Sequence, residues 1–432
     1  MNSQSSADES QHLVAISMLE KMQEMPRILH TSAGQISCCI FRAPQSLVSI
    51  NLKAYEPHIV SIGPYHHGKH QLQMIQEHKW RFLRNHLSRP RNSDRSLDDY
   101  LQAIGSLEKR ARQSYSGHIS LDRDKFIEML VLDGCFIIEI LLITGGVVPP
   151  VDDKDPIFTM TWILPFLLRD LIIPFFVLQH LFNLSAQKDD PLLSFLVLEF
   201  FNTLMQRPVE VIQRYANLDA FHLLDIFRKS LIPDEKTPPK TAKSSSSPNM
   251  IHCATKLYQN GIKFKVGKSD SILDINFRNG VIEIPTITID DFVTAALLNC
   301  IAFEQCHGSE ITHINAYALF LGALIHTAKD VGLLRDNDVV ENYYGTDEEV
   351  ARFFNDLGKD IAIDLETSYL SRLFIEVNLY YKNTWYVQLA TFKHNYVDTP
   401  WKFLSALAAL ILLTLTTVQT FFAVFGYFRP PL

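Results

Sequence analysis

The segment from Phe403 to Phe428 constrains this chain more than any other part of the sequence. It reads FLSALAALILLTLTTVQTFFAVFGYF, contains no charged residue, and is bracketed by Lys402 and Arg429. As an α-helix it would be about 39 Å long, enough to cross a hydrocarbon core of roughly 30 Å with some tilt. Trp401 and Tyr427 stand near its ends, where aromatic rings favour the membrane interface. The sequence therefore predicts a single transmembrane helix here, in preference to a buried core helix.

The position of this helix predicts how the chain is inserted in the lipid bilayer and which side its other residues occupy. Four residues, RPPL, follow Phe428, so we expect a tail anchor inserted after translation. Three lysines lie over residues 382–402 and one arginine follows the helix, which favours a cytosolic location for residues 1 to about 400. We expect the plasma membrane, with an endomembrane as the alternative. Asn183 begins a glycosylation sequon that would stay unmodified in this orientation.

Composition limits what the rest of the chain can be. Hydrophobic residues make up 47% and charged residues 20% of the 432 residues, as in globular proteins of one to three domains. The net charge of -7 and the lack of a Lys/Arg-rich run argue against a nucleic-acid partner. The N-terminus has no signal-peptide pattern. Six cysteines without a framework spacing indicate a reducing compartment: Cys38, Cys39, Cys135, Cys253, Cys300 and Cys306.

A polar segment divides the remaining sequence into two predicted lobes. Residues 233–249, PDEKTPPKTAKSSSSPN, cannot build a core and predict a disordered linker or loop. It separates a helical lobe over 36–232 from a second lobe over 250–400, although a loop inserted within one domain would have the same composition. Residues 1–35 predict a polar tail and an amphipathic helix. The apolar residues of that helix recur every three positions: Leu13, Ile16, Leu19 and Met22.

The periodicity of both lobes predicts a mainly α fold with a small antiparallel sheet. Apolar residues recur at spacings of three and four through most of the sequence, which indicates amphipathic helices. Convincing strand patterns occur over residues 262–267, 272–277 and 281–289. Asn279 and Gly280 separate two of them, which is the composition of a two-residue hairpin turn. We therefore expect a hairpin or short meander in the second lobe.

Two further apolar stretches predict buried core helices instead of membrane spans. Residues 131–148, VLDGCFIIEILLITGGVV, include Asp133 and Glu139, and charges at mid-helix are expensive in lipid. Residues 156–182 contain two charged side chains and two internal prolines, which interrupt a helix. We expect these stretches to form the interior of the first lobe.

The densest group of histidines lies in the stretch VSIGPYHHGKH and just after it. His66, His67, His70 and His78 are the candidate metal ligands of this sequence. Adjacent histidines rarely share one metal ion, and no Cys-x-x-Cys or His-Glu-x-x-His pattern completes a site. The favoured interpretation is a Gly-Pro turn before a helix, with no bound metal and no cofactor.

Buried acidic and sulfur-containing residues provide the other candidates for chemistry. Asp133 and Glu139 could act as acids with raised pKa values, but structural pairing is the favoured interpretation, with Arg110 or Arg112 as the partner. Residues Cys300, Cys306 and His307 lie on an apolar helix, where consecutive side chains point about 100° apart. They predict core positions, because Cys306 and His307 cannot face each other. The phosphate-binding, dinucleotide, hydrolase and kinase motifs do not occur.

Several stretches together resemble a plant family catalogued as domain of unknown function 247. The resemblance runs in order along nearly the whole chain and is specific as a set, although each piece alone is weak. The stretches are INLKAYEPHIVSIGPYHHGKHQL, EHKWRFL, FIEMLVLDGCFIIEILL, IPFFVLQHLF, HLLDIFRKSL, LDINFRNGVIEIPTITID, NCIAFEQC, TAKDVGLL and PWKFLSALAALILLTLTTVQTFFAVFGYF. One departure is Asp170-Leu171-Ile172, where the family usually has Glu-Asn-Gln, so no role of that triplet is transferred.

The resemblance implies a plant protein with a largely helical fold, a membrane segment at the end and no established enzymatic activity. Some grass relatives are implicated in self-incompatibility, a role that the resemblance does not extend to this chain. The favoured hypothesis is a membrane-anchored, non-enzymatic interaction protein with an unidentified protein partner. The alternative is a membrane-associated enzyme, perhaps a hydrolase, that uses His66 and His67 or the Asp133–Glu139 region.

Overall fold

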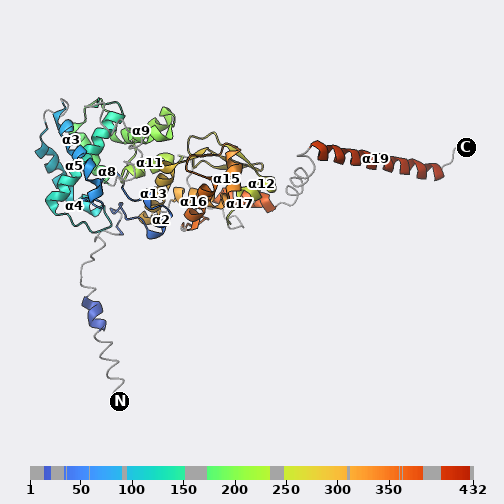
Figure 1. The fold of residues 1–432 in the computed structure, drawn as a ribbon, viewed down its shortest axis with the longest axis horizontal. Helices are drawn as coiled ribbons and strands as arrows, with labels where there is room; N and C mark the ends of the chain where they lie inside the picture. The colour runs from blue at the N-terminus through green and yellow to red at the C-terminus, as the bar shows by residue number, and fades with distance from the viewer. Residues whose placement is uncertain are drawn as a thin grey trace, which may run out of the picture. The chain divides into compact units, whose positions relative to one another are not determined.

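The protein is described from a computed structural model in which α-helices predominate (Figure 1). The described residues are 14–20, 34–35, 37–57, 59–89, 95–150, 173–233, 248–308, 312–359, 361, 363–382 and 400–428. Most of the predicted linker over 233–249 lies outside them, as does the stretch 156–172 with Asp170-Leu171-Ile172. Of the predicted N-terminal helix, residues 14–20 are helical, whereas Leu13 and Met22 lie outside the described residues.

The chain divides into two compact units that are not continuous in sequence. The first consists of Met1–Ile232 and Asp291–Asn315, and the second of Pro233–Asp290 and Ala316–Leu432. Besides residues 14–20, the helices that the structure describes in the first unit are α2 (Gln45–Ile50), η1 (Leu52–Ala54), η2 (His70–Leu72), α3 (Gln73–Ser88), α4 (Leu97–Gln113), α5 (Arg123–Thr144), α8 (Phe175–Ser185), α9 (Leu193–Met205), α10 (Val209–Arg214), α11 (Leu223–Leu231) and α13 (Asp291–His307).

Helix α5 is the centre of the first unit and packs against α3, α4, α8 and α9. Its residues from Met129 to Leu142 are buried on every side, as expected of a helix that is apolar all round. The Asp122 carboxylate begins the helix by accepting a hydrogen bond from the Lys125 backbone N–H at 2.9 Å. Gly134 lets α8 approach closely, because a Cβ atom there would lie 2.3 Å from the Leu181 side chain. The prediction of a buried core helix is confirmed for this stretch.

The second unit contains the predicted hairpin and two parallel strand pairs. Strands β2 (Asn276–Arg278) and β3 (Val281–Ile284) are antiparallel, and Asn279 and Gly280 between them have φ of 50° and 77°. These positive φ values are those of a type I′ turn, so the hairpin is confirmed. Strand β1 (Lys263–Val266) pairs with the far edge of β3 in parallel, which the expectation of an antiparallel sheet did not include. The direction follows because the chain reverses twice between β1 and β3, once before β2 and once at the hairpin turn.

This unit also contains a second, two-stranded sheet and several further helices. Strands β4 (Ile287–Ile289) and β5 (Val340–Asn342) are parallel. The Asp330 carboxylate joins two helices, since it caps α15 through the Thr327 N–H at 2.9 Å and accepts from the Thr255 N–H at 2.8 Å. The helices are α12 (Ala254–Gln259), α14 (His313–Leu324), of which Ala316–Leu324 lies in this unit, α15 (Ala328–Arg335), α16 (Asp347–Lys359) and α17 (Ser371–Lys382).

The last helix, α19 (Pro400–Phe428), has the length and composition of a membrane span over Leu407–Phe425. None of that window is buried against the rest of the chain. Among the described residues, α14 and α15 would pass the same test only as one segment, but they are bent by 106° and their apolar side chains are largely buried. The predicted apolar C-terminal helix is therefore confirmed as a helix.

Candidate functional site

The stretch VSIGPYHHGKH is fixed to the centre of the first unit by a buried ion pair. Lys79 of α3 and Asp133 of α5 are both 0% exposed, and their Nζ and Oδ1 atoms lie 2.5 Å apart. The Lys79 ammonium also donates to the Ser61 carbonyl, and the second oxygen of Asp133 accepts from the Gly63 N–H at 2.8 Å. Each charge thus has partners beyond the ion pair, which is what makes its burial tolerable.

Glu139, one turn and a half further along α5, belongs to a second buried network. Its carboxylate accepts from Arg89 Nε at 2.6 Å and contacts His86 Nδ1 at 3.1 Å. The other ring nitrogen of His86 lies 3.2 Å from the Tyr100 hydroxyl. Burial would raise the pKa of Glu139, but the hydrogen bonds from His86 and Arg89 outweigh it and hold the pKa below its usual value.

The predicted arginine partners of these carboxylates were wrong. Arg112 pairs with Glu108 on its own helix at 2.8 Å, and Arg110 lies over the Phe176 ring at 3.9 Å. The partners found, Lys79 and Arg89, come from α3 and the residue that caps it. The favoured interpretation, structural pairing of Asp133 and Glu139, nevertheless agrees with both networks.

Sequence reasoning missed a third network, at the junction of α11 and α13. The Arg228 guanidinium lies between Asp225 at 3.0 Å and Glu304 at 3.1 Å. Glu304 also accepts from the backbone N–H groups of Ile314 at 3.2 Å and Asn315 at 2.9 Å. The charged residues inside the apolar stretches HLLDIFRKSL and NCIAFEQC were the signal that could have indicated it.

The four candidate histidines do not converge. His67 and His70 are exposed, whereas His66 and His78 are partly buried. Among the residues that the structure describes, no group of three or more His, Cys, Asp or Glu side chains is placed to hold a metal ion. Of the four, His66 lines a cavity of the first unit.

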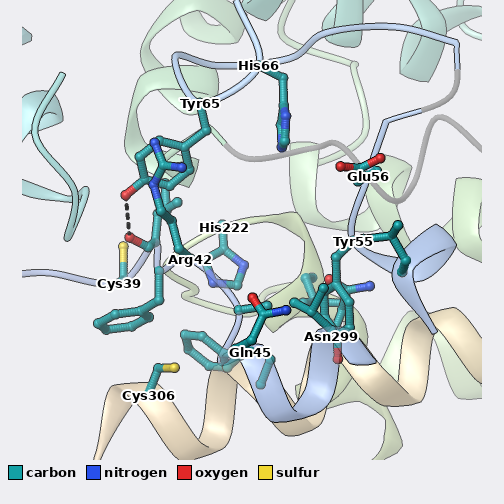
Figure 2. A pocket seen from close by; sticks show the side chains of 18 residues that line it. Cys39, Arg42, Gln45, Tyr55, Glu56, Tyr65, His66, His222, Asn299 and Cys306 are labelled. Carbon is teal, nitrogen blue, oxygen red and sulfur yellow. Dashed lines mark hydrogen bonds between the residues drawn. The ribbon is translucent and has the colours of Figure 1, made fainter. Parts of the chain in front are cut away.

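This cavity has a volume of about 350 Å³ and is lined by four segments that are distant in sequence (Figure 2). The segment from Cys39 to Glu56 and the pair Tyr65 and His66 form one part, while His222, Leu224 and α13 form the rest. Two hydrogen bonds hold the first segment to α13: Tyr55 Oη donates to the Leu298 carbonyl at 3.0 Å, and Asn299 Nδ2 donates to the Ala54 carbonyl at 2.9 Å.

The thiols and imidazoles that line the cavity are held in their neutral forms. Burial raises the pKa of Cys39 to about 12 and also raises that of Cys306, so both are thiols and weak nucleophiles at neutral pH. Burial lowers the pKa of His66 and of His222 to about 4, so both imidazoles are uncharged. His222 Nδ1 accepts from the Asp225 N–H at 3.2 Å and thereby caps α11. Such neutral groups suit ligand binding better than nucleophilic attack.

The first unit also contains an apolar hollow of about 820 Å³ between α3, α4 and α5. Trp80 and Leu97 line it and are 48% and 41% exposed. Its charged lining residues, Arg123, Asp124 and Glu128, are of both signs. The hollow therefore has apolar surface without a marked charge preference.

The residues of the enzymatic alternative do not share one cavity. Asp133 and Glu139 are buried at 0% and 1% exposure and are engaged in the ion pairs described above, whereas His67 is exposed. Of these residues, the cavity in Figure 2 contains only His66. The described structure does not bring them together as a catalytic group.

DUF247 is a family of plant proteins of unknown function. Its sequence model matches residues 40–415 of this chain. The chain belongs to this family. The UPF0481 protein At3g47200 of Arabidopsis thaliana is 37% identical over 429 residues, covering 93% of this chain and 89% of the relative. The putative UPF0481 protein At3g02645 of the same plant is 22% identical over 487 residues, covering 91% and 92%. No solved structure matches.

The DUF247 match covers both buried ion-pair networks of α5 and all the cavity residues from Ile40 to Cys306. It also extends to residue 415 and so includes the first half of α19. Apart from Cys39, the cavity residues and the beginning of the apolar helix therefore lie within the part of the chain that matches the family.

The Lys79–Asp133 pair gives a direct test of this architecture. We expect Asp133→Ala or Lys79→Met to lower the free energy of unfolding by about 3–5 kcal/mol, because each leaves one buried charge without its partner. The double variant Lys79→Met/Asp133→Leu removes both charges, so its free energy of unfolding should fall less than that of either single variant. Chemical denaturation of the purified protein measures these differences.

An exposed ion pair provides the control for that measurement. Arg372 and Glu376 of α17 are 2.7 Å apart, and the arginine side chain is 82% exposed. Glu376→Ala should leave the stability nearly unchanged, because solvent screens such a pair. If the Lys79 and Asp133 variants lowered the free energy of unfolding as little as Glu376→Ala does, the ion pair would not hold the loop as described.

His222 predicts a pH dependence of stability. Its pKa of about 4 in the folded protein lies below the ordinary value of 6.5, so between these pH values the unfolded chain binds more protons. Stability should therefore fall as the pH is lowered from 6.5 to 4, by up to about 3 kcal/mol from this residue. His222→Asn keeps an acceptor for the Asp225 N–H and should show a shallower fall in denaturation experiments across this range. Identical slopes in both proteins would contradict this assignment.

Proposed function

We propose that this DUF247 protein is a membrane-anchored, non-enzymatic binding protein that presents its two helical units to partners in the cytosol. The observation that carries the anchoring is the exposed apolar surface of α19 over Leu407–Phe425. Apolar surface of this extent is unfavourable in water and favourable in a lipid bilayer, and the length matches the hydrocarbon core. A bilayer is therefore the environment that best fits this helix.

The polar groups of the first unit support binding in preference to catalysis. Asp133, Glu139 and Glu304 are buried and accept hydrogen bonds from cations and backbone groups, so they serve the fold. The cavity thiols and imidazoles are neutral, for the reasons given above, and no nucleophile of the cavity has a hydrogen-bonded base among the described residues. A protein with this chemistry is suited to recognition.

The cysteines support the cytosolic orientation, and Asn183 allows it to be tested. All six cysteines are free thiols, as expected in a reducing compartment. The Asn183 side chain is exposed, so in a glycosylating compartment its sequon would be accessible to modification. We propose the plasma membrane as the location, with an endomembrane as the alternative.

The anchor is tested by placing charges at the centre of α19. Leu412→Arg combined with Leu415→Arg should move the protein from the carbonate-washed membrane pellet to the soluble fraction, because each arginine costs about 2.5–3.5 kcal/mol at mid-helix. The matched control Leu412→Ile/Leu415→Ile should stay in the pellet. Equal retention of the arginine variant would contradict the proposal.

Glycan analysis of the same membranes tests the orientation. We expect Asn183 to carry no glycan, whereas an acceptor sequon added after Leu432 should be modified if α19 crosses an endoplasmic reticulum membrane. A glycan on Asn183 would place the helical units on the opposite side.

A further inference from the structure

We propose that the 350 Å³ cavity of the first unit binds a small organic monocarboxylate, with the carboxylate between Arg42 and His66 and an aromatic or short aliphatic body against the apolar wall (Figure 2). This inference goes beyond the proposed function and does not depend on the membrane anchor. It assigns a ligand class to a cavity built from segments before, within and after the stretch VSIGPYHHGKH.

The shape and lining of the cavity select a small, partly apolar molecule. Its volume of about 350 Å³ lies in the range of small-molecule sites, which are mostly apolar with a few convergent polar groups. The apolar wall offers two aromatic rings and several aliphatic side chains to the body of a ligand: Phe41, Val48, Leu52, Ala302 and Phe303. A ligand without an apolar part would leave this wall in contact with water.

Arg42 provides the cation. Its guanidinium lies over the Tyr65 ring at 4.6 Å, and among the described residues it pairs with no carboxylate. The ring beneath it is fixed, because Tyr65 Oη accepts from the Gly117 N–H at 2.9 Å and donates to the Ile40 carbonyl at 3.3 Å. A guanidinium held flat in this way keeps N–H donors available for a carboxylate, which it binds with two parallel hydrogen bonds.

His66 provides an unsatisfied polar atom. Its Nδ1 is buried and has no hydrogen-bond partner within the described part of the chain. In Figure 2 the ring points from the loop into the cavity. A buried polar atom without a partner costs free energy, and a carboxylate oxygen that accepts from the Nδ1–H tautomer would remove that cost. Burial is the largest cause of the lowered pKa of His66, and the positive charges of Lys69 and Arg42 are the next largest. Cationic groups therefore lie near this ring.

The charges around the cavity favour one negative charge over two. Arg42 is the one cationic side chain among the cavity residues, and Glu56 lies across from it in Figure 2. Glu56 acts electrostatically on His66 as well, so its carboxylate is close enough to repel a second negative charge. A phosphate dianion usually needs several donors or cations, whereas a monocarboxylate needs one guanidinium and one further donor. The site therefore fits a monocarboxylate better than a phosphate.

Calorimetric titration of the full chain in detergent or nanodiscs tests this inference with phenylacetate as the probe. We expect saturable binding at one site, at least tenfold weaker binding of the uncharged phenylacetamide, and no displacement of phenylacetate by equimolar inorganic phosphate. Arg42→Gln should weaken phenylacetate binding at least tenfold without unfolding the protein, because Arg42 is exposed and forms no ion pair with a described residue.

Arg110 supplies a matched control, because it too is an exposed arginine stacked on an aromatic ring, at 3.9 Å from the centre of Phe176, and it lies outside the cavity. Arg110→Gln should leave phenylacetate binding unchanged. The inference is overturned if the folded protein shows no saturable binding, if the amide or phosphate binds as tightly as phenylacetate, or if Arg42→Gln and Arg110→Gln behave alike.

Discussion

The ion pair between Lys79 and Asp133 is the interaction on which the first unit depends. Two buried charges are costly to desolvate, and here each is also bound by the backbone of the stretch VSIGPYHHGKH, at Ser61 and Gly63. The pair thus ties α3 and α5 to a loop that has no regular structure of its own. Since the same loop continues into Tyr65 and His66, the ion pair also sets where one wall of the cavity lies.

Local patterns predicted the elements of the fold but not how they meet. The uncharged run Phe403–Phe428, the apolar run of α5 and the Asn279–Gly280 turn each lie within one short stretch, and each forms the helix or turn that it predicts. The partner of Asp133 is 54 residues away, so periodicity could not distinguish Lys79 from Arg110 or Arg112. The parallel pairing of β1 with β3 likewise depends on contacts between separate segments.

The candidate site was less predictable, because its residues are gathered from four separate segments. The sequence drew attention to His66 for its histidine neighbours, yet His67 and His70 are exposed and His66 instead lines a cavity. Arg42 and His222 occur in no motif with recognisable chemistry. Their relevance appears only when the chain brings them to one cavity, where Arg42 stacks on Tyr65 and His222 caps α11.

We propose that the helical units recruit partners while α19 holds them at a membrane. Proximity labelling tests it most directly, with a biotin ligase fused to the N-terminus of the full chain. The comparison is a fusion in which residues 1–399 are replaced by an unrelated soluble domain of similar size and residues 400–432 are kept. The account predicts a small, reproducible set of cytosolic proteins labelled by the full chain alone. Identical sets from both fusions would contradict it.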